Sequence, residues 1–401
     1  MLQAFRAKSV ITLAQEGAAR GIKALEAPLA ELDDGVIVVE DKRVVSVESF
    51  SAFRRSVHSL CSLTDLGYVR LAPALINAHC HLELSHLAGA TRGGGGFTAW
   101  LLSLIPLAAE AVLPEVLLKR LHAVLEQVRH SGTVHVGDVG SRNPALVAQA
   151  AEKRCGITHF LEVFGFGRPA PSEYIPQVLA AQGYCPEAAA FLSPDRYDWC
   201  AIAGHSLYSV SPEALLAAFA WCRERRRPFS VHLAESGEEE ECLLHGKGAL
   251  YELLRQRLLP HDWRHPGMKS TAYAGMLGLL GPRTLAVHCV QCSSADISLL
   301  ARKGTNVCLC PRSNHFIGTG LAPAERMAEK GVLLCLGTDS LASNHDLDMK
   351  KEMQAARTFW GFSDRAVLRM ATVNAAHALD LGHLGVIAPG KTAAFFIYPD
   401  F

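Results

Sequence analysis

Histidines and carboxylates stand at the ends of several apolar runs in this chain of 401 residues. His79 and His81 are two residues apart, and residues at that spacing on an extended strand face the same side. Both imidazoles can therefore reach one ion, to which His232 adds a third nitrogen and Asp339 an oxygen. Three nitrogens and one oxygen suit Zn²⁺, with Fe²⁺, Mn²⁺ or Ni²⁺ as alternatives. A coordination position left to water would make the site catalytic rather than structural.

The grouping of these residues matters more than any one of them. A lone histidine in an apolar strand is more often a satisfied core residue than a metal ligand. Several imidazoles and a carboxylate buried near one axis are different, because their desolvation is costly unless something pairs them. A divalent cation would pair them, so we predict one divalent metal ion per subunit.

A further carboxylate, Glu235, follows His232 by three residues. That spacing puts Glu235 at the rim of the predicted site rather than among the ligands. A rim carboxylate beside a metal-bound water is a natural proton shuttle. The alternative is a surface salt-bridge residue, since the acidic run at 238–241 just downstream is typical of a solvated face.

Eight short apolar runs alternate with segments of helical periodicity, which favours a parallel sheet buried on both faces. The expected strands are residues 74–79, 133–138, 157–164, 201–206, 229–235, 284–290, 305–310 and 332–339. Eight repeats predict an α/β fold of the (β/α)8 TIM barrel type, with an open doubly wound sheet as the alternative. In a barrel, the polar residues at the carboxyl ends of the strands would meet at one active site.

The two ends of the chain predict a separate small β domain. Two β-branched runs at 35–40 and 44–47 flank a polar turn and indicate a hairpin, and residues 395–398 form another β-like run. We therefore expect residues 1–70 and 375–401 to form a small β-sandwich domain and residues 71–374 to form the catalytic barrel.

Composition excludes several classes of protein. Hydrophobic residues make up 49% of the chain, which excludes intrinsic disorder. Lys+Arg and Asp+Glu both number 39, so the basic excess of a nucleic-acid binder is missing. We expect no membrane association, since no apolar run is long enough to span a bilayer. The start lacks a secretory h-region and the 12 cysteines are scattered, so we expect reduced thiols in a cytoplasmic protein.

Five short motifs narrow the interpretation. They are NAHCHLELS (77–85), VHLAES (231–236), CPRSN (310–314), LGTDSLASN (336–344) and PGK (389–391). Together they resemble the amidohydrolase superfamily. The local strings are similar to its adenine-deaminating branch, which contains methylthioadenosine/S-adenosylhomocysteine deaminases and aminodeoxyfutalosine deaminases. The strings around Glu235 and Asn314 most resemble the aminodeoxyfutalosine group.

The resemblance implies a role for each matching residue. His79, His81, His232 and Asp339 match the ligands of a mononuclear metal site. Glu235 matches an acid/base that carries protons, and His288 and Asp339 match groups that orient the attacking water. The implied reaction is attack of metal-bound hydroxide on the amine-bearing carbon of a purine nucleoside derivative, with release of ammonia. The best candidate substrate is 6-amino-6-deoxyfutalosine.

The same resemblance suggests substrate contacts. His205, after the fourth expected strand, matches a substrate-contacting histidine, and Ser313 and Asn314 lie where loop residues next to the substrate occur. Arg312 is a candidate partner for a substrate carboxylate such as the benzoate of aminodeoxyfutalosine, or else a structural arginine that braces its loop. Trp100 is a candidate cover for a base or ribose, or else a packing residue.

Other readings of the sequence remain open at this point. The alternatives are deamination of S-adenosylhomocysteine, methylthioadenosine or adenosine, hydrolytic dechlorination, a guanine- or cytosine-type deaminase on the same scaffold, and a non-enzymatic assembly protein. A second zinc deaminase design uses H-x-E with P-C-x-x-C. Cys289 and Cys292 mimic part of it but lack the proline. The glycine run at 93–96 indicates a flexible loop or a lid, and relatives of this kind are often homo-oligomers.

Overall fold

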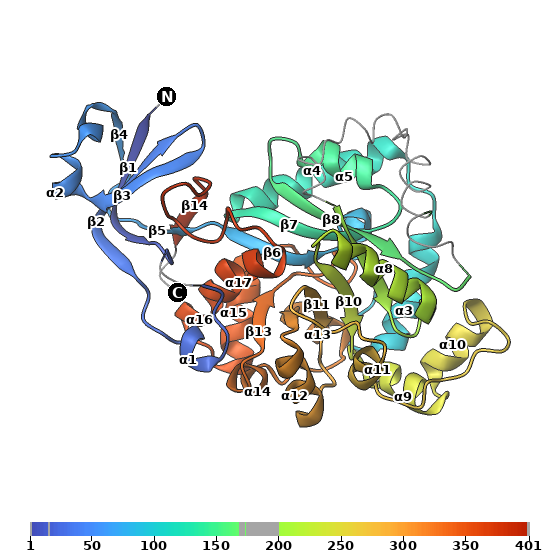
Figure 1. The fold of residues 1–401 in the computed structure, drawn as a ribbon. Coiled ribbons are helices and arrows are strands. Elements are labelled where there is room, and N and C mark those ends of the chain that lie inside the picture. The colour runs from blue at the N-terminus through green and yellow to red at the C-terminus, as the bar shows by residue number, and fades with distance from the viewer. Residues whose placement is uncertain (1, 15–16, 168–172, 174–199, 399–401) are drawn as a thin grey trace.

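The structure is a computed structural model that describes residues 2–14, 17–167, 173 and 200–398. It has two parts, a barrel of parallel strands surrounded by helices and a mixed sheet made from the two ends of the chain (Figure 1). Among the described helices, none is both long and apolar enough to cross a bilayer.

All eight expected barrel strands are present in one sheet, and neighbours in the chain are neighbours in the sheet. They are β6 (Leu75–Cys80), β7 (Thr133–Gly140), β8 (Gly156–Val163), β9 (Cys200–Ser206), β10 (Phe229–Leu233), β11 (Thr284–His288), β12 (Asn306–Leu309) and β13 (Leu333–Leu336). Every pair is parallel. The predicted barrel is therefore confirmed, and all eight carboxyl ends point the same way.

The barrel closes where β6 meets the residues that follow β13. The Asn77 side-chain amide donates to Thr338 Oγ1 at 2.7 Å and its carbonyl oxygen accepts from Thr338 N at 3.1 Å. The backbone N–H groups of Thr338 and Asp339 both donate to His79 O at 3.1 Å. These bonds tie the residue before Asp339 to the strand that carries His79, so closure of the barrel also sets the distance between two predicted ligands.

Helices follow most of the strands and cover the barrel. Those described are α3 (Phe97–Ala109), α4 (Pro114–His130), α5 (Pro144–Ala151), α8 (Pro212–Glu224), α9 (Gly237–His245), α10 (Ala249–Arg257), α11 (Ser270–Met276), α12 (Ser294–Lys303), α13 (Pro311–Ile317), α14 (Ala324–Glu329), α15 (Met349–Trp360), α16 (Asp364–Ala371) and α17 (Val373–Ala378), with short turns α1 (Ile22–Leu25) and α2 (Phe50–Phe53). α8 begins with a side-chain cap, in which the Ser211 hydroxyl accepts from Ala214 N.

The terminal segments build a separate sheet of six described strands. They are β1 (Gln3–Ile11), β2 (Glu31–Glu40), β3 (Arg43–Ser49), β4 (Ser62–Asp65), β5 (Arg70–Pro73) and β14 (Phe395–Tyr398). The expected hairpin is β2–β3, and Asp41 and Lys42 take positive φ values of 47° and 64° in its turn. One edge of β1 pairs first with β4 and then with β5, so the single sheet divides there.

The expected division of the chain at residue 375 falls inside α17. Ala375 and Ala376 pack in the same buried cluster as Ile76 and Phe160 of the barrel strands. The chain joins the terminal sheet at β14, which pairs with β5. The division of the chain into these two domains stays a prediction.

We predict that Gly337→Ala destabilises the barrel at its closure. A Cβ at Gly337 would lie 2.9 Å from His79 N and 2.8 Å from Cys308 Sγ, which is too close for either neighbour to tolerate. Overpacking of this kind costs about 1–3 kcal/mol of unfolding free energy, measurable by denaturant titration. Gly281→Ala is the control, because a Cβ there meets nothing within 4 Å. Equal stability of the two variants would contradict the prediction.

Candidate active site

Four of the predicted site residues converge above the carboxyl ends of the strands. His79 lies on β6 with His81 just after it, His232 lies on β10, and Asp339 follows β13. His232 Nε2 is 3.3 Å from both His79 Nε2 and His81 Nε2. Asp339 Oδ1 is 3.5 Å from each of the same two nitrogens. Three imidazole nitrogens and one carboxylate oxygen thus face one point. The i, i+2 spacing accounts for the two histidines of the first strand, which point to the same side.

Outer contacts aim two of these groups inward. His232 Nδ1 lies 2.8 Å from the backbone oxygen of His205, to which it must donate because a carbonyl oxygen only accepts. The proton of the neutral ring is therefore on Nδ1, and the lone pair of Nε2 faces the cluster. Asp339 Oδ2 accepts from the hydroxyls of Ser313 at 2.7 Å and Ser343 at 2.6 Å. Oδ1 is left to face the histidines.

Burial sets the charge of the cluster. His79 and His288 are each 1% exposed. Burial lowers the pKa of His79 and lowers that of His288 to about 3. It also lowers the pKa of His232 well below its usual value. Burial alone would raise the pKa of Asp339, but hydrogen bonding to His79 and the charges of His81 and His288 hold it well below its usual range. Burial thus favours the neutral rings of His79, His232 and His288, whereas Asp339 favours its carboxylate form.

This donor set fits a divalent cation. The rings of His79 and His232 are neutral, as metal ligation requires, and a carboxylate supplies negative charge. The inward-facing atoms of His79, His81 and Asp339 lie within 4.8 Å of one another, as do those of His79, His232 and His288. Without a cation, three imidazole Nε2 atoms would crowd one another with few donors among them. The arrangement therefore supports a divalent metal held by these side chains.

The backbone is strained where the site residues leave their strands. Ala234, His288 and Asp339 have φ values of 50°, 74° and 57°, in the left-handed region that residues with a Cβ rarely adopt. Each such residue costs about 1–3 kcal/mol. Backbone strain of this kind persists only where surrounding contacts stabilise it. Here the strained residues lie in the turns that direct side chains toward the barrel axis.

Glu235 and His288 form a second pair beside the cluster. His288 Nδ1 accepts from the Asn314 side-chain amide at 3.1 Å, so the proton of the neutral ring is on Nε2. That atom lies 3.6 Å from Glu235 Oε1. Burial raises the pKa of Glu235 well above its usual value, helped by the charges of Asp339 and Glu239. A carboxyl group with a raised pKa can both accept and donate a proton near neutral pH.

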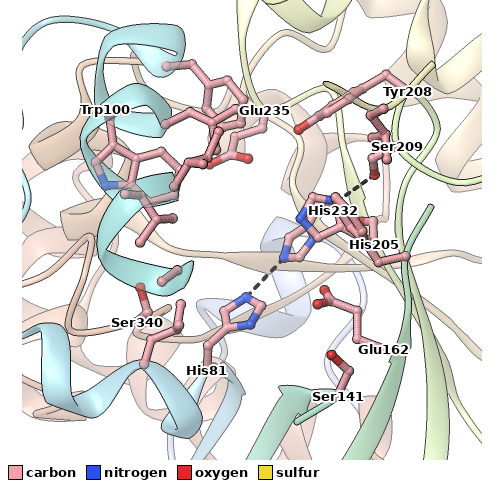
Figure 2. Close-up of a pocket in the computed structure, with 18 of the residues that line it drawn as sticks. His81, Trp100, Ser141, Glu162, His205, Tyr208, Ser209, His232, Glu235 and Ser340 are labelled. Atoms are coloured by element: carbon pink, nitrogen blue, oxygen red, sulfur yellow. Dashed lines mark hydrogen bonds between the residues drawn. The ribbon is translucent and has the colours of Figure 1, made fainter. Parts of the chain in front are cut away.

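These groups form the polar end of a cavity of about 830 Å³. Figure 2 shows His81, His205 and His232 close together, with Glu235 and Trp100 on one side and Glu162 and Ser141 on another. The rest of the cavity is mainly apolar, and its wall comes from two helices. The wall residues are Leu101, Leu104, Ile105 and Ala108 of α3 and Leu253 and Leu254 of α10.

Comparison with known proteins agrees with this geometry. The sequence profile of the amidohydrolase family matches residues 70–400. The chain belongs to the amidohydrolase family.

Similar proteins share both sequence and fold with this amidohydrolase. A 5-methylthioadenosine/S-adenosylhomocysteine deaminase of Nitratidesulfovibrio vulgaris is 29% identical over 381 residues, covering 90% of this chain and 78% of the relative. Helicobacter pylori aminofutalosine deaminase, solved with methylthio-coformycin, superposes with a TM-score of 0.80 at 22% identity, covering 99% and 93% of the two chains. A Xanthomonas campestris adenosine deaminase with bound zinc gives 0.76 at 24% identity, covering 98% and 83%.

Of the expected substrate contacts, His205 and Trp100 line the cavity of the amidohydrolase. His205 Nδ1 is 2.6 Å from the Ser209 hydroxyl, which fixes the ring at the end of β9. Trp100 Nε1 donates to Ala342 O at 2.8 Å, so the indole is held against the loop after β13 at the wall of the cavity. Both residues are in position to meet a bound ligand.

The structure places Arg312, Ser313 and Asn314 elsewhere than expected, since none of them lines the cavity. Arg312 makes a two-pronged ion pair with Asp346 at 2.8 and 3.1 Å and also contacts Glu352 at 3.4 Å. Its contacts support the bracing role rather than a substrate carboxylate. Ser313 and Asn314 stand behind Asp339 and His288, because the first turn of α13 points its polar side chains at the cluster rather than past it.

The glycine run and the cysteines also have specific places. Gly94 N and Gly96 N donate to the backbone oxygens of Phe316 and Ile317, at 2.7 and 3.1 Å, so the run at 93–96 is pinned to α13. Cys289 and Cys292 are buried thiols. Glu83 lines the cavity together with His81 and accepts from the backbone N–H groups of residues 141 and 142.

Several lining residues were not singled out by the sequence. Glu162 near the end of β8 is 9% exposed and lines the cavity, and burial raises its pKa to about 7. The sequence could have indicated Glu162 as a lining residue, because it is a carboxylate near the carboxyl end of a barrel strand. Tyr208 and Arg257 line the cavity from a loop and from α10, and nothing local distinguishes them in the sequence.

We predict that His232→Ala loses its metal. The substitution removes the Nε2 that lies within 3.3 Å of both other histidines. Affinity should fall by more than the roughly 10–100-fold that loss of an outer-shell partner costs, measured as bound metal after dialysis. His130→Ala is the control, because the His130 side chain is 66% exposed at the end of α4. Full retention of metal by His232→Ala would remove that residue from the ligand set.

Proposed function

We propose that this amidohydrolase is a metal-dependent deaminase that hydrolyses the amine of an adenine nucleoside derivative and releases ammonia. The observation that carries the proposal is the position of Glu235, a buried carboxyl group beside His288 and next to a cluster suited to a cation, at the polar end of a cavity. The deaminase named for methylthioadenosine and S-adenosylhomocysteine, at 29% identity, supports the reaction class. Zinc is the proposed metal, because three nitrogens and one oxygen are a zinc-type donor set.

The chain's own residues would divide the work as follows. When bound, the divalent ion lowers the pKa of a coordinated water from about 15.7 to about 7. Glu235 takes a proton from the attacking water and delivers it to the ring nitrogen beside the amine-bearing carbon. His288, whose Nε2 hydrogen faces Glu235, and Asp339 orient the attacking oxygen. Glu235 then moves the proton of the newly added hydroxyl group to the amine, so that the C–N bond breaks, ammonia leaves and the hydroxyl oxygen becomes the carbonyl of the hypoxanthine ring.

The shape of the cavity bears on the substrate. With the purine at the polar end, the 5′ substituent of a nucleoside would lie along the leucines of α3 and α10. Two exposed arginines also line this cavity: Arg257, and Arg142, whose Nη1 donates to the backbone oxygen of Ala108. An apolar wall that ends at cations suits an aryl group carrying a carboxylate, which 6-amino-6-deoxyfutalosine has. S-adenosylhomocysteine also carries a carboxylate and is the second candidate, whereas methylthioadenosine and adenosine offer the arginines nothing to bind.

We predict that Glu235→Gln keeps its metal and loses turnover. Gln cannot accept the proton that the reaction moves, so kcat should fall by about 10²–10⁴-fold, the usual contribution of general acid–base catalysis. The measurements are ammonia release and bound metal. Glu241→Gln is the control, because that side chain is 44% exposed on α9. Wild-type turnover in Glu235→Gln would remove Glu235 from its role.

A panel of 6-amino-6-deoxyfutalosine, S-adenosylhomocysteine, methylthioadenosine and adenosine tests the substrate. We expect the highest kcat/KM for the first. Arg257→Ala should raise its KM by about tenfold, or about 1.4 kcal/mol, and leave the KM of adenosine unchanged. Arg255→Ala is the control on the same helix, since Arg255 is 60% exposed and faces Glu252. A preference for adenosine, or an equal effect of Arg257→Ala on every substrate, would contradict the aryl carboxylate proposal.

A further inference from the structure

A buried carboxylate outside the ligand set contacts the backbone of the proposed acid/base. Glu239, in the first turn of α9, is 1% exposed. One of its oxygens accepts from Glu235 N at 2.7 Å. The other accepts from Ala234 N at 3.0 Å and from the Ser270 hydroxyl at 2.6 Å. One carboxylate thus holds two successive backbone N–H groups, and the second belongs to Glu235 itself.

The turn after β10 needs such a partner. The strand ends at Leu233, so the next two N–H groups have left the parallel ladder and are buried. A buried N–H without an acceptor costs about 1–3 kcal/mol. Ala234 also has a φ of 50°, a conformation that an alanine does not hold unaided. On the other side of the turn, Gln291 N donates to Ala234 O at 2.8 Å. Hydrogen bonds therefore stabilise the turn from both sides, and the bond from Glu235 N to Glu239 is the one made by Glu235 itself.

We propose that Glu239 is a positioning residue that fixes the backbone at Ala234 and Glu235, so that the Glu235 carboxyl group points into the cavity beside His288. This inference rests on the proposed function, because it acts through the proton transfers assigned to Glu235. Glu239 does not line the cavity, so it would touch neither substrate nor reacting atoms. Its effect is on kcat, since a displaced acid/base slows chemistry while the walls that bind the nucleoside are unchanged.

Glutamine cannot replace Glu239, although it has the same shape. Two backbone N–H groups need acceptors, and a carboxamide offers one oxygen and one NH₂. Whichever way the amide turns, its NH₂ faces a backbone donor. Glu239→Gln therefore releases one N–H of the turn without creating a cavity.

The adjacent residue provides a matched control. Glu240 is also largely buried, at 9% exposed, and lies on the same helix. One of its oxygens accepts from Ser270 N at 3.3 Å, and no bond to residue 234 or 235 is found for it among the described residues. A single carboxamide oxygen can serve that one donor, so Glu240→Gln should leave turnover unchanged.

The test is a double-mutant cycle of Glu239→Gln with Glu235→Gln, assayed with the most active nucleoside of the panel. We expect Glu239→Gln to lower kcat by about 10–100-fold, the scale of a 1 Å misplacement. Its KM should stay within about twofold, with bound metal and Tm close to wild type. In the Glu235→Gln background the same change should cause no further loss, because a positioning residue has nothing left to position. Backbone amide exchange in the peptide over residues 234–236 should be faster in Glu239→Gln and not in Glu240→Gln.

Each result decides a separate point. Wild-type kcat or unchanged amide exchange in Glu239→Gln would overturn the positioning role and leave the function of Glu235 intact. A loss that multiplies fully in the double variant would show a general structural effect and also overturn it. Full activity of Glu235→Gln alone would overturn the proposed mechanism together with this role. If Glu239→Gln does not fold, Ser270→Ala removes the third donor to Glu239. A decrease in kcat that vanishes in the Glu235→Gln background then supports the proposal, and wild-type kcat contradicts it.

Discussion

Burial of neutral imidazoles around one carboxylate is the constraint on which the rest of the site depends. His79, His232 and His288 are nearly inaccessible to water, so their rings stay neutral at pH values where free histidine begins to charge. A neutral ring offers one lone pair, and its direction depends on which nitrogen holds the proton. That choice is made by groups outside the cluster, such as the backbone oxygen of His205 behind His232. The chemistry at the centre is therefore set by contacts that never meet the substrate.

The same constraint explains why the strain is local. The site side chains lie at the ends of the strands and point toward the barrel axis. To point there, the backbone must turn sharply where the strand ends. Ala234, His288 and Asp339 make that turn with positive φ values. Hydrogen bonds hold each turn: Cys289 N donates to Leu233 O at 3.0 Å, and Asp339 N donates to His79 O at 3.1 Å. The backbone is strained at the ends of these strands, and the folding free energy of the closed barrel offsets the free-energy cost of that strain.

Local signals in the sequence were enough for the fold and the centre of the site. Apolar runs located all eight strands, and the polar residues that interrupt them located the histidines and Asp339, since both signals belong to single elements. Roles that depend on another element could not be read. Arg312 resembled a substrate ligand until Asp346 and Glu352 appeared beside it. The acidic run at 238–241 resembled a solvated face, yet Glu239 is buried because the turn after β10 and Ser270 fold over it.

Reaction and specificity are built from different parts of this chain. The polar end of the cavity comes from strand ends whose spacing is fixed by barrel closure, whereas its apolar wall comes from α3 and α10. Adenine nucleosides share the ring that reacts and differ chiefly in the group on the 5′ carbon. A fold that fixes one end of the cavity and leaves the other end to two helices can keep one reaction while its substrate changes.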